Sequence, residues 1–252
     1  MATKQMGALA AAGLMAATTG LSGCSAKTET LTVFAAASLE PSFTKLGEQY
    51  KAETGNEVTF SFAGSADLLS QLKNGAPADI LATADEATMK KATEDTNGAL
   101  VKNSTIFAKN EITIATTDGN PKHVTDLASL NQPDLRVVTC AVQVPCGAAT
   151  KKVTEDAGVA LKPVSEENSV TDVLGKLTSG QADAALVYRT DVKRASKPVA
   201  EVEIPTAAEF ANSYPIARTA GTQNDEAAQK FIDYVLSDSG RKVLTEAGFE
   251  QP

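Results

Sequence analysis

Four short runs of small residues indicate the chemistry that this chain can perform. They occupy residues 35–38, 63–65, 144–147 and 168–170. Each run stands at the start of a predicted helix, where unpaired backbone N–H groups and the helix dipole favour an anion, and small side chains let a ligand approach that backbone closely. None of the runs contains lysine or arginine, whereas Ser38 and Ser65 add hydroxyl donors. The pattern predicts an anion site built from neutral hydrogen-bond donors.

The elements that would position these runs are short strands alternating with helices. Strand patterns occur at residues 31–34, 58–62, 79–82, 112–114, 135–138 and 184–188. Helical spacing of apolar residues occurs at 39–50, 68–72, 148–157, 170–179, 231–235 and 241–247. The alternation predicts an α/β fold with parallel sheets, in which ligands bind beyond the carboxyl ends of the strands. Ser38 is also placed to cap the helix that has Pro41 in its first turn.

The composition narrows the class of protein. The chain has 252 residues, a hydrophobic content of 42% and a formal net charge of −8, so it can build two lobes and has no basic surface for nucleic acid. The only histidine, His123, lies in a turn-like stretch, which disfavours histidine metal sites and Ser-His-Asp catalysis. We expect no enzyme activity, no metal cation and no cofactor. One lobe is expected to comprise residues 30–110 and 217–252, and the other residues 111–216.

The N-terminus has the layout of a bacterial lipoprotein leader. A lysine, an apolar stretch and small residues precede Cys24 in the sequence Leu21-Ser22-Gly23-Cys24. This pattern predicts a signal peptide at residues 1–23, acylation of Cys24, a polar tether at residues 24–29 and a protein anchored to the outer face of the cell membrane. Cys140 and Cys146 remain as a pair in an exported protein, where a disulfide between them is expected, with two buried free thiols as the alternative.

Several motifs together resemble the periplasmic molybdate-binding proteins of ABC importers. They are VFAAASL at residues 33–39, FAGS at 62–65, NGAPAD at 74–79 and LVY at 186–188. The resemblance extends over residues 24–252 and implies a type II periplasmic-binding-protein fold, in which two α/β lobes, each a sheet flanked by helices, hold the ligand in the cleft between them.

The resemblance also implies a ligand, a partner and a set of contacts. The ligand is molybdate or tungstate, a tetrahedral oxyanion that carries its molybdenum as substrate, and the partner is a membrane permease that receives it from a monomer. The contacts carried over by motif are the hydroxyls of Ser38, Ser65 and Tyr188 and the backbone amides of Cys146 and Val170. Cys146 departs from the small residue, such as alanine, that is common in this loop, although only its amide is needed for binding.

Three alternatives remain at the level of sequence. The same fold can bind sulfate or another oxyanion, because cavity size decides between them. A sensor or adhesion ectodomain with a degenerate site is a second alternative. An extracellular hydrolase with Ser38 or Ser65 as nucleophile is the third, but the chain has no Gly-x-Ser-x-Gly motif.

Overall fold

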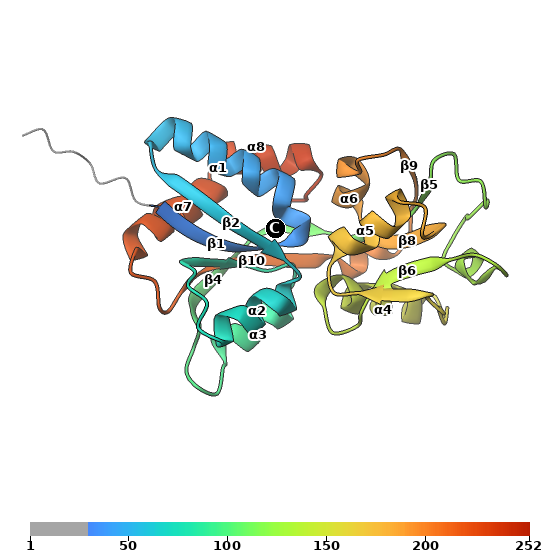
Figure 1. Ribbon diagram of the computed structural model, residues 1–252, viewed down its shortest axis with the longest axis horizontal. Coiled ribbons are helices and arrows are strands. Elements are labelled where there is room, and N and C mark those ends of the chain that lie inside the picture. Colours follow the sequence, from blue (N-terminus) through green and yellow to red (C-terminus); the bar gives the residue numbers. More distant parts are fainter. Residues whose placement is uncertain (1–29) are drawn as a thin grey trace, which may run out of the picture.

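The protein consists of two lobes side by side, joined by extended strands (Figure 1). The structure is a computed structural model that describes residues 30–252. The predicted leader, the predicted lipidation site Cys24 and the predicted tether lie outside the described residues. Within the described part of the chain, no helix is both long and apolar enough to cross a membrane.

The first lobe contains a five-stranded sheet in the order β2-β1-β3-β10-β4. Its strands are β1 (Thr30–Ala36), β2 (Glu57–Ala63), β3 (Ile80–Ala82), β4 (Val101–Asn110) and β10 (Asn212–Thr219). Strands β1, β2 and β3 run parallel, so their carboxyl ends lie at the same edge of the sheet. This edge faces the second lobe (Figure 1).

Helices cover both faces of this sheet, because side chains of successive strand residues point to opposite faces. Val33 belongs to a core with the helices α1 (Glu40–Thr54), α7 (Asp225–Leu236) and α8 (Asp238–Ala247). Its neighbour Phe34 packs instead with α2 (Ser65–Lys73) and α3 (Glu86–Thr93).

The second lobe repeats this construction around a sheet of order β7-β6-β8-β5-β9. Its strands are β5 (Ile112–Thr117), β6 (Val137–Cys140), β7 (Ser165–Glu167), β8 (Ala184–Tyr188) and β9 (Val199–Val202). Its helices are α4 (Pro145–Asp156), α5 (Val170–Thr178) and α6 (Arg189–Arg194). Short 3₁₀ turns lie at Ala128–Asn131 and Ala207–Phe210 in this lobe and at Ala37–Leu39 in the first lobe. One hydrophobic core unites the sheet with α4 and α5.

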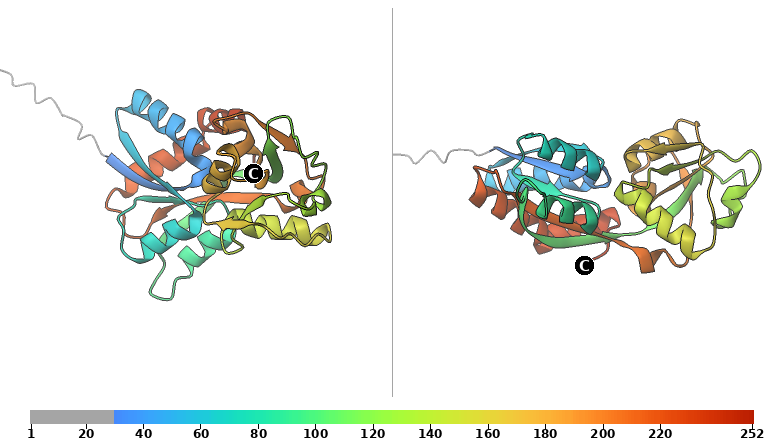
Figure 2. Two further views of the ribbon diagram at one scale, coloured as in Figure 1. Left: turned by 45° about the vertical axis from the view of Figure 1, so that its right-hand side comes forward. Right: turned by 90° about the horizontal axis from the view of Figure 1, so that it is seen from below.

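The chain crosses between the lobes at two adjacent positions. It leaves the first sheet at the end of β4 and enters the second with β5, and the return strand β10 pairs with β4 from Asn212 onward, opposite Asn110. The views of Figure 2 show these crossing segments running together from lobe to lobe. The predicted end of the second lobe at residue 216 is therefore wrong, because residues 212–216 already pair within the first sheet.

The sheets are mixed, whereas the sequence predicted parallel ones. Strand β10 runs antiparallel to β3 and β4, and β5 runs antiparallel to β8 and β9. A strand that arrives from the other lobe enters its sheet from the cleft side, so it opposes strands that end at the cleft. The helices α3 and α6 were also not anticipated, and α4 begins at Pro145, three residues before the expected start at residue 148.

Candidate functional site

A small cavity lies between the two lobes, and the structure brings all five of the site residues expected from the sequence to its wall. Ser38 and Ser65 come from the first lobe, and Cys146, Val170 and Tyr188 come from the second. The remaining wall residues are Ala36, Ala37, Gly64, Ala84, Val144, Pro145, Asn168 and Ser169. The space in which the centre of a water molecule could move inside the cavity is only about 20 Å³, so the occupant must be small.

Helix N-termini converge on the cavity from both lobes. Ser65 is the first residue of α2, Val170 is the first residue of α5, and Cys146 lies in the first turn of α4. The first four N–H groups of a helix have no partner within it, so backbone donors are available here. Ser169 caps α5 through its side chain, which accepts a 3.2 Å hydrogen bond from the Asp172 N–H.

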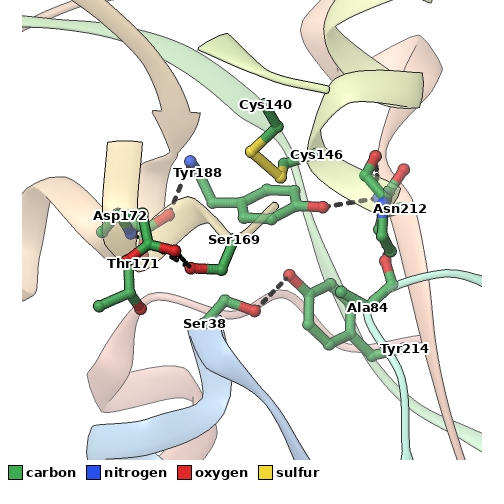
Figure 3. Close-up of a disulfide and its surroundings, with 12 residues drawn as sticks. Ser38, Ala84, Cys140, Cys146, Ser169, Thr171, Asp172, Tyr188, Asn212 and Tyr214 are labelled. Carbon is green, nitrogen blue, oxygen red and sulfur yellow. Dashed lines mark hydrogen bonds between the residues drawn. A yellow bond between two sulfur atoms is a disulfide. The ribbon is translucent and has the colours of Figure 1, made fainter. Parts of the chain in front are cut away.

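Ser38 does not cap a helix, contrary to the prediction. The residue lies in a 3₁₀ turn, α1 begins only at Glu40, and the structure gives this helix no side-chain cap. The Ser38 hydroxyl instead lies 3.0 Å from the hydroxyl of Tyr214 on β10 (Figure 3). Tyr214 accepts from the Asn110 side-chain amide at 3.4 Å. When the Tyr214 hydroxyl donates this hydrogen bond to Ser38, the Ser38 hydroxyl can donate its own hydrogen to a ligand in the cavity.

The Ser65 and Tyr188 hydroxyls of the wall also accept hydrogen bonds from the protein. The Ser65 hydroxyl accepts from the Ala84 backbone N–H at 3.0 Å. The Tyr188 hydroxyl accepts from the Asn212 side-chain amide at 2.8 Å, and Figure 3 shows the two groups directed at one another. A hydroxyl has one hydrogen to donate. Because Ser65 and Tyr188 act as acceptors in these two bonds, the hydrogen of each hydroxyl remains available for a ligand. Both hydroxyls are thereby arranged as donors.

No side chain of the cavity wall is charged. Tyr188 is its one titratable group, and burial holds the pKa of its hydroxyl well above the usual range, so the group stays protonated. Behind it, the buried Asp191 carboxylate accepts from the Tyr188 N–H at 2.9 Å and pairs with Arg194 at 2.7 Å. Burial raises the pKa of Asp191, while Arg194 opposes this effect. The wall is therefore rich in donors and carries no net charge of its own.

A disulfide joins Cys140 at the end of β6 to Cys146 in α4, as expected from the sequence, with 5.7 Å between the two Cα atoms. It fastens the first turn of α4 to the adjacent strand. Gly147 permits this close packing, since a Cβ there would lie 2.0 Å from the Ala141 carbonyl oxygen. The bridge and the glycine together set the position of the Cys146 backbone.

The lobes touch where the cavity closes. A Cβ on Gly64 of the first lobe would lie 2.2 Å from the Asn168 carbonyl oxygen of the second. Arg194 of the second lobe also lies 3.8 Å from Glu40 of the first. The described structure is therefore the closed arrangement of the two lobes.

Other candidate sites within the described residues have fewer features of a binding site. His123 is exposed in a turn and does not line the cavity. No group of three or more histidine, cysteine or acidic residues within residues 30–252 is arranged to hold a metal ion. A larger groove of about 570 Å³ lies at the far end of the first lobe, where β1 begins. Its carboxylate, Asp79, is already bound to the Thr32 N–H and the Thr222 hydroxyl.

The sequence analysis did not identify the buried residues that hydrogen-bond to the hydroxyls of the cavity wall from outside the cavity. Asn212 and Tyr214 alternate along β10 and Asn110 ends β4, and all three are buried polar groups close to the cavity hydroxyls. Asn212, Tyr214 and Ile216 occupy every second position, which is the spacing of residues that share one face of a strand. Nothing local in the sequence indicated that this strand passes beneath the cleft.

Two lobes that close on a cavity at the carboxyl ends of their strands define a solute-binding protein. The chain belongs to the bacterial extracellular solute-binding proteins, whose family model matches residues 31–250. This confirms the family expected from the sequence motifs.

Within this family the chain is homologous to the molybdate-binding protein ModA of Mycobacterium tuberculosis, with 44% identity over 223 residues that cover 88% of this chain and 85% of the relative. The periplasmic molybdate-binding protein of Azotobacter vinelandii has a TM-score of 0.77 at 20% identity, over 88% of this chain and 99% of that structure. The sulfate-binding protein SubI of Mycobacterium tuberculosis has a TM-score of 0.67 at 22% identity, over 88% of this chain and 86% of that structure. At these identities the two structures establish the shared fold.

Proposed function

We propose that this protein captures molybdate, and tungstate, in the cavity between its lobes and delivers the anion to the permease of an ABC importer. The observation that carries the proposal is the wall of the cavity, where Ser38, Ser65 and Tyr188 present hydroxyls beside unpaired helix N–H groups and no charged side chain. The 44% identity to a molybdate-binding protein over most of the chain supports the same ligand.

The chemistry of the ligand fits a wall of donors. Molybdate and tungstate are fully deprotonated dianions at neutral pH, so they only accept hydrogen bonds. Hydrogen bonds to a charged acceptor are stronger than neutral ones, and exclusion of water by lobe closure strengthens them further. Phosphate at neutral pH always keeps at least one proton, and the Ser65 and Tyr188 oxygens each already accept a hydrogen bond from the protein, which leaves them poorly placed to accept another from the ligand. The site should therefore reject the protonated anion.

We assign the five contacts as the sequence motifs imply. Ser38, Ser65 and Tyr188 donate through their hydroxyls, and Cys146 and Val170 donate through their backbone amides. The crossing strands act as the hinge about which the lobes open and close on the ligand. The protein acts as a binding protein without catalysis of its own, as a monomer, and is anchored at the outer face of the membrane through acylated Cys24.

Calorimetric titration of the protein lacking residues 1–23 with molybdate, tungstate, sulfate and phosphate tests the proposal. We expect tight binding of molybdate and tungstate and far weaker binding of phosphate. Tighter binding of sulfate than of molybdate would reassign the protein to sulfate, because the shorter S–O bonds would then fit the cavity better. Equal binding of all four anions, or of none, would overturn the proposal.

A further inference from the structure

The side chain of Asn212, at the start of the return strand β10, meets both lobes and the cavity wall. Building on the proposed function, we propose that Asn212 is a positioning residue: it points the Tyr188 hydroxyl hydrogen into the cavity and thereby helps the site to select fully deprotonated oxyanions. Asn212 does not line the cavity itself, so it acts through Tyr188 rather than on the ligand.

The hydrogen-bond partners of Asn212 determine which end of its amide faces Tyr188. Its nitrogen lies 2.9 Å from the Ala84 carbonyl oxygen and 3.3 Å from the Pro145 carbonyl oxygen. Carbonyl oxygens can only accept, so the atom between them must be the NH₂ group and not the amide oxygen. The same nitrogen lies 2.8 Å from the Tyr188 hydroxyl. Its two hydrogens serve the two shorter contacts, to Ala84 and Tyr188, so the Tyr188 hydroxyl accepts, and the contact to Pro145 is the weakest of the three.

This arrangement leaves the Tyr188 hydrogen to be donated elsewhere. The phenol has a single hydrogen, and its oxygen lies at the wall of the cavity. The Tyr214 hydroxyl is a neutral acceptor for that hydrogen. An oxyanion in the cavity is a stronger acceptor, so the hydrogen is directed to the oxyanion once it is bound. Without the Asn212 amide, the hydroxyl could turn and accept a hydrogen bond, which is what a protonated oxyanion would need. Asn212 therefore gives the hydroxyl a fixed direction.

The same contacts link this direction to closure of the lobes. Ala84 belongs to the first lobe, whereas Pro145 and Tyr188 belong to the second. Asn212 is buried at the crossing, where its backbone pairs with Asn110 of β4. The amide meets acceptors from both lobes only when they are together, so the Tyr188 donor is set as the cavity forms.

A double-mutant cycle separates this role from a merely structural one. Asn212→Leu should weaken molybdate binding about 10-fold, because it removes the group that orients a donor to a charged ligand. In a Tyr188→Phe background, which has no hydroxyl to orient, the same change should weaken binding less than about threefold. Asn212→Leu should also reduce the ratio of phosphate to molybdate dissociation constants, because the freed hydroxyl can then accept.

Asn110→Leu is the matched control, since it removes the paired buried asparagine of the same hinge. Asn110 donates to Thr190 and Tyr214 and reaches Tyr188 only through Tyr214, so its effect should differ between the wild-type and Tyr188→Phe backgrounds by much less than that of Asn212→Leu. If Asn212→Leu does not fold, Asn212→Ala enters the same cycle.

Equal effects of the Asn212 substitution in the two backgrounds, or wild-type affinity in the single variant, would overturn the inference. Failure of the wild-type protein to bind any oxyanion would instead overturn the proposed function, and the inference with it.

Discussion

The backbone of Gly64 in the first lobe lies against the Asn168 carbonyl oxygen of the second, so closely that a Cβ at position 64 would approach that oxygen to 2.2 Å. The contact stands at the rim of the cavity, between a loop that follows β2 and the loop that leads into α5. Complete closure of the lobes therefore requires glycine here.

Gly64→Ala should weaken molybdate binding by at least about 10-fold, while the ligand-free protein keeps nearly the melting temperature of the wild type. The backbone of Gly64, at φ −57° and ψ 138°, is open to any residue, so the variant meets its clash only when the lobes close. Calorimetry and thermal unfolding measure the two effects. Gly221→Ala, where an added Cβ has nothing within 4 Å, is the control and should bind normally. Wild-type affinity in Gly64→Ala would show that closure does not need this contact.

Ser38→Ala, Ser65→Ala and Tyr188→Phe should each weaken molybdate binding by about 10- to 100-fold. Each change removes one hydroxyl donor to a buried dianion, and hydrogen bonds to charged groups contribute roughly 1.5–3 kcal/mol. Calorimetry with molybdate provides the measurement. Ser42→Ala is a matched control, because the Ser42 hydroxyl is buried in α1 and donates to the Leu39 carbonyl away from the cavity. Normal binding by all three site variants would place the ligand elsewhere.

The affinity for molybdate should stay constant within about twofold between pH 6 and pH 9, because no group of the wall titrates in that range. Loss of the Tyr188 proton would remove a donor and add a negative charge, so it would weaken binding. Burial raises the pKa of Tyr188, which moves this loss to higher pH than for an ordinary tyrosine. Titrations at several pH values test the point. A marked fall in affinity between pH 7 and pH 8 would indicate a contact that the proposed set lacks.

Reduction of the disulfide, or the double change Cys140→Ser/Cys146→Ser, should weaken molybdate binding more than the accompanying fall in melting temperature suggests. A bridge that closes so short a loop stabilises the fold by about 2 kcal/mol in the chain-entropy description. Its further effect is to hold the Cys146 amide in place before the ligand arrives, which lowers the ordering cost of binding. Mass spectrometry of the non-reduced protein checks the bridge itself. Free thiols under oxidising conditions would remove it from this account without removing the binding function.

Asp183→Asn should lower the stability of the fold at pH 7 by about 1 kcal/mol, and the difference from the wild type should disappear in acid. Hydrogen bonds from the Arg136 guanidinium lower the pKa of Asp183 in the folded protein. The carboxylate thus contributes fully above its unfolded pKa of about 3.9, and the contribution is lost as pH falls through the lower folded value. Thermal unfolding between pH 7 and pH 2 measures this. Glu155→Gln, which breaks an exposed pair with Lys151, is the control and should change the stability little. A wild-type dependence of stability on pH in Asp183→Asn would contradict the stabilising role of the Asp183–Arg136 pair.

Much of the site could be predicted because its parts are local. A run of small residues between a strand and a helix is visible within a few positions, and this signal predicts the four loops that contain Ser38, Ser65, Cys146 and Val170. The choice of Cys146 and Val170 as contacts rests on the resemblance to the family. The same locality explains one error. Ser38 followed by Pro41 has the spacing of a helix cap, but the serine hydroxyl is bound to Tyr214, 176 positions along the chain.

The sequence by itself determined the alternation of strands and helices, the family, and the small-residue loops that expose backbone donors, since each of these follows from side-chain type and spacing. Only the tertiary structure decided that β10 runs antiparallel beneath the cleft, that Gly64 closes against Asn168, and that Asn212 stands behind Tyr188. The physical reason is the short range of these interactions. The direction of a hydrogen bond and the clash of a methyl group depend on atoms about 3 Å away or closer, and folding brings those atoms together from distant parts of the chain.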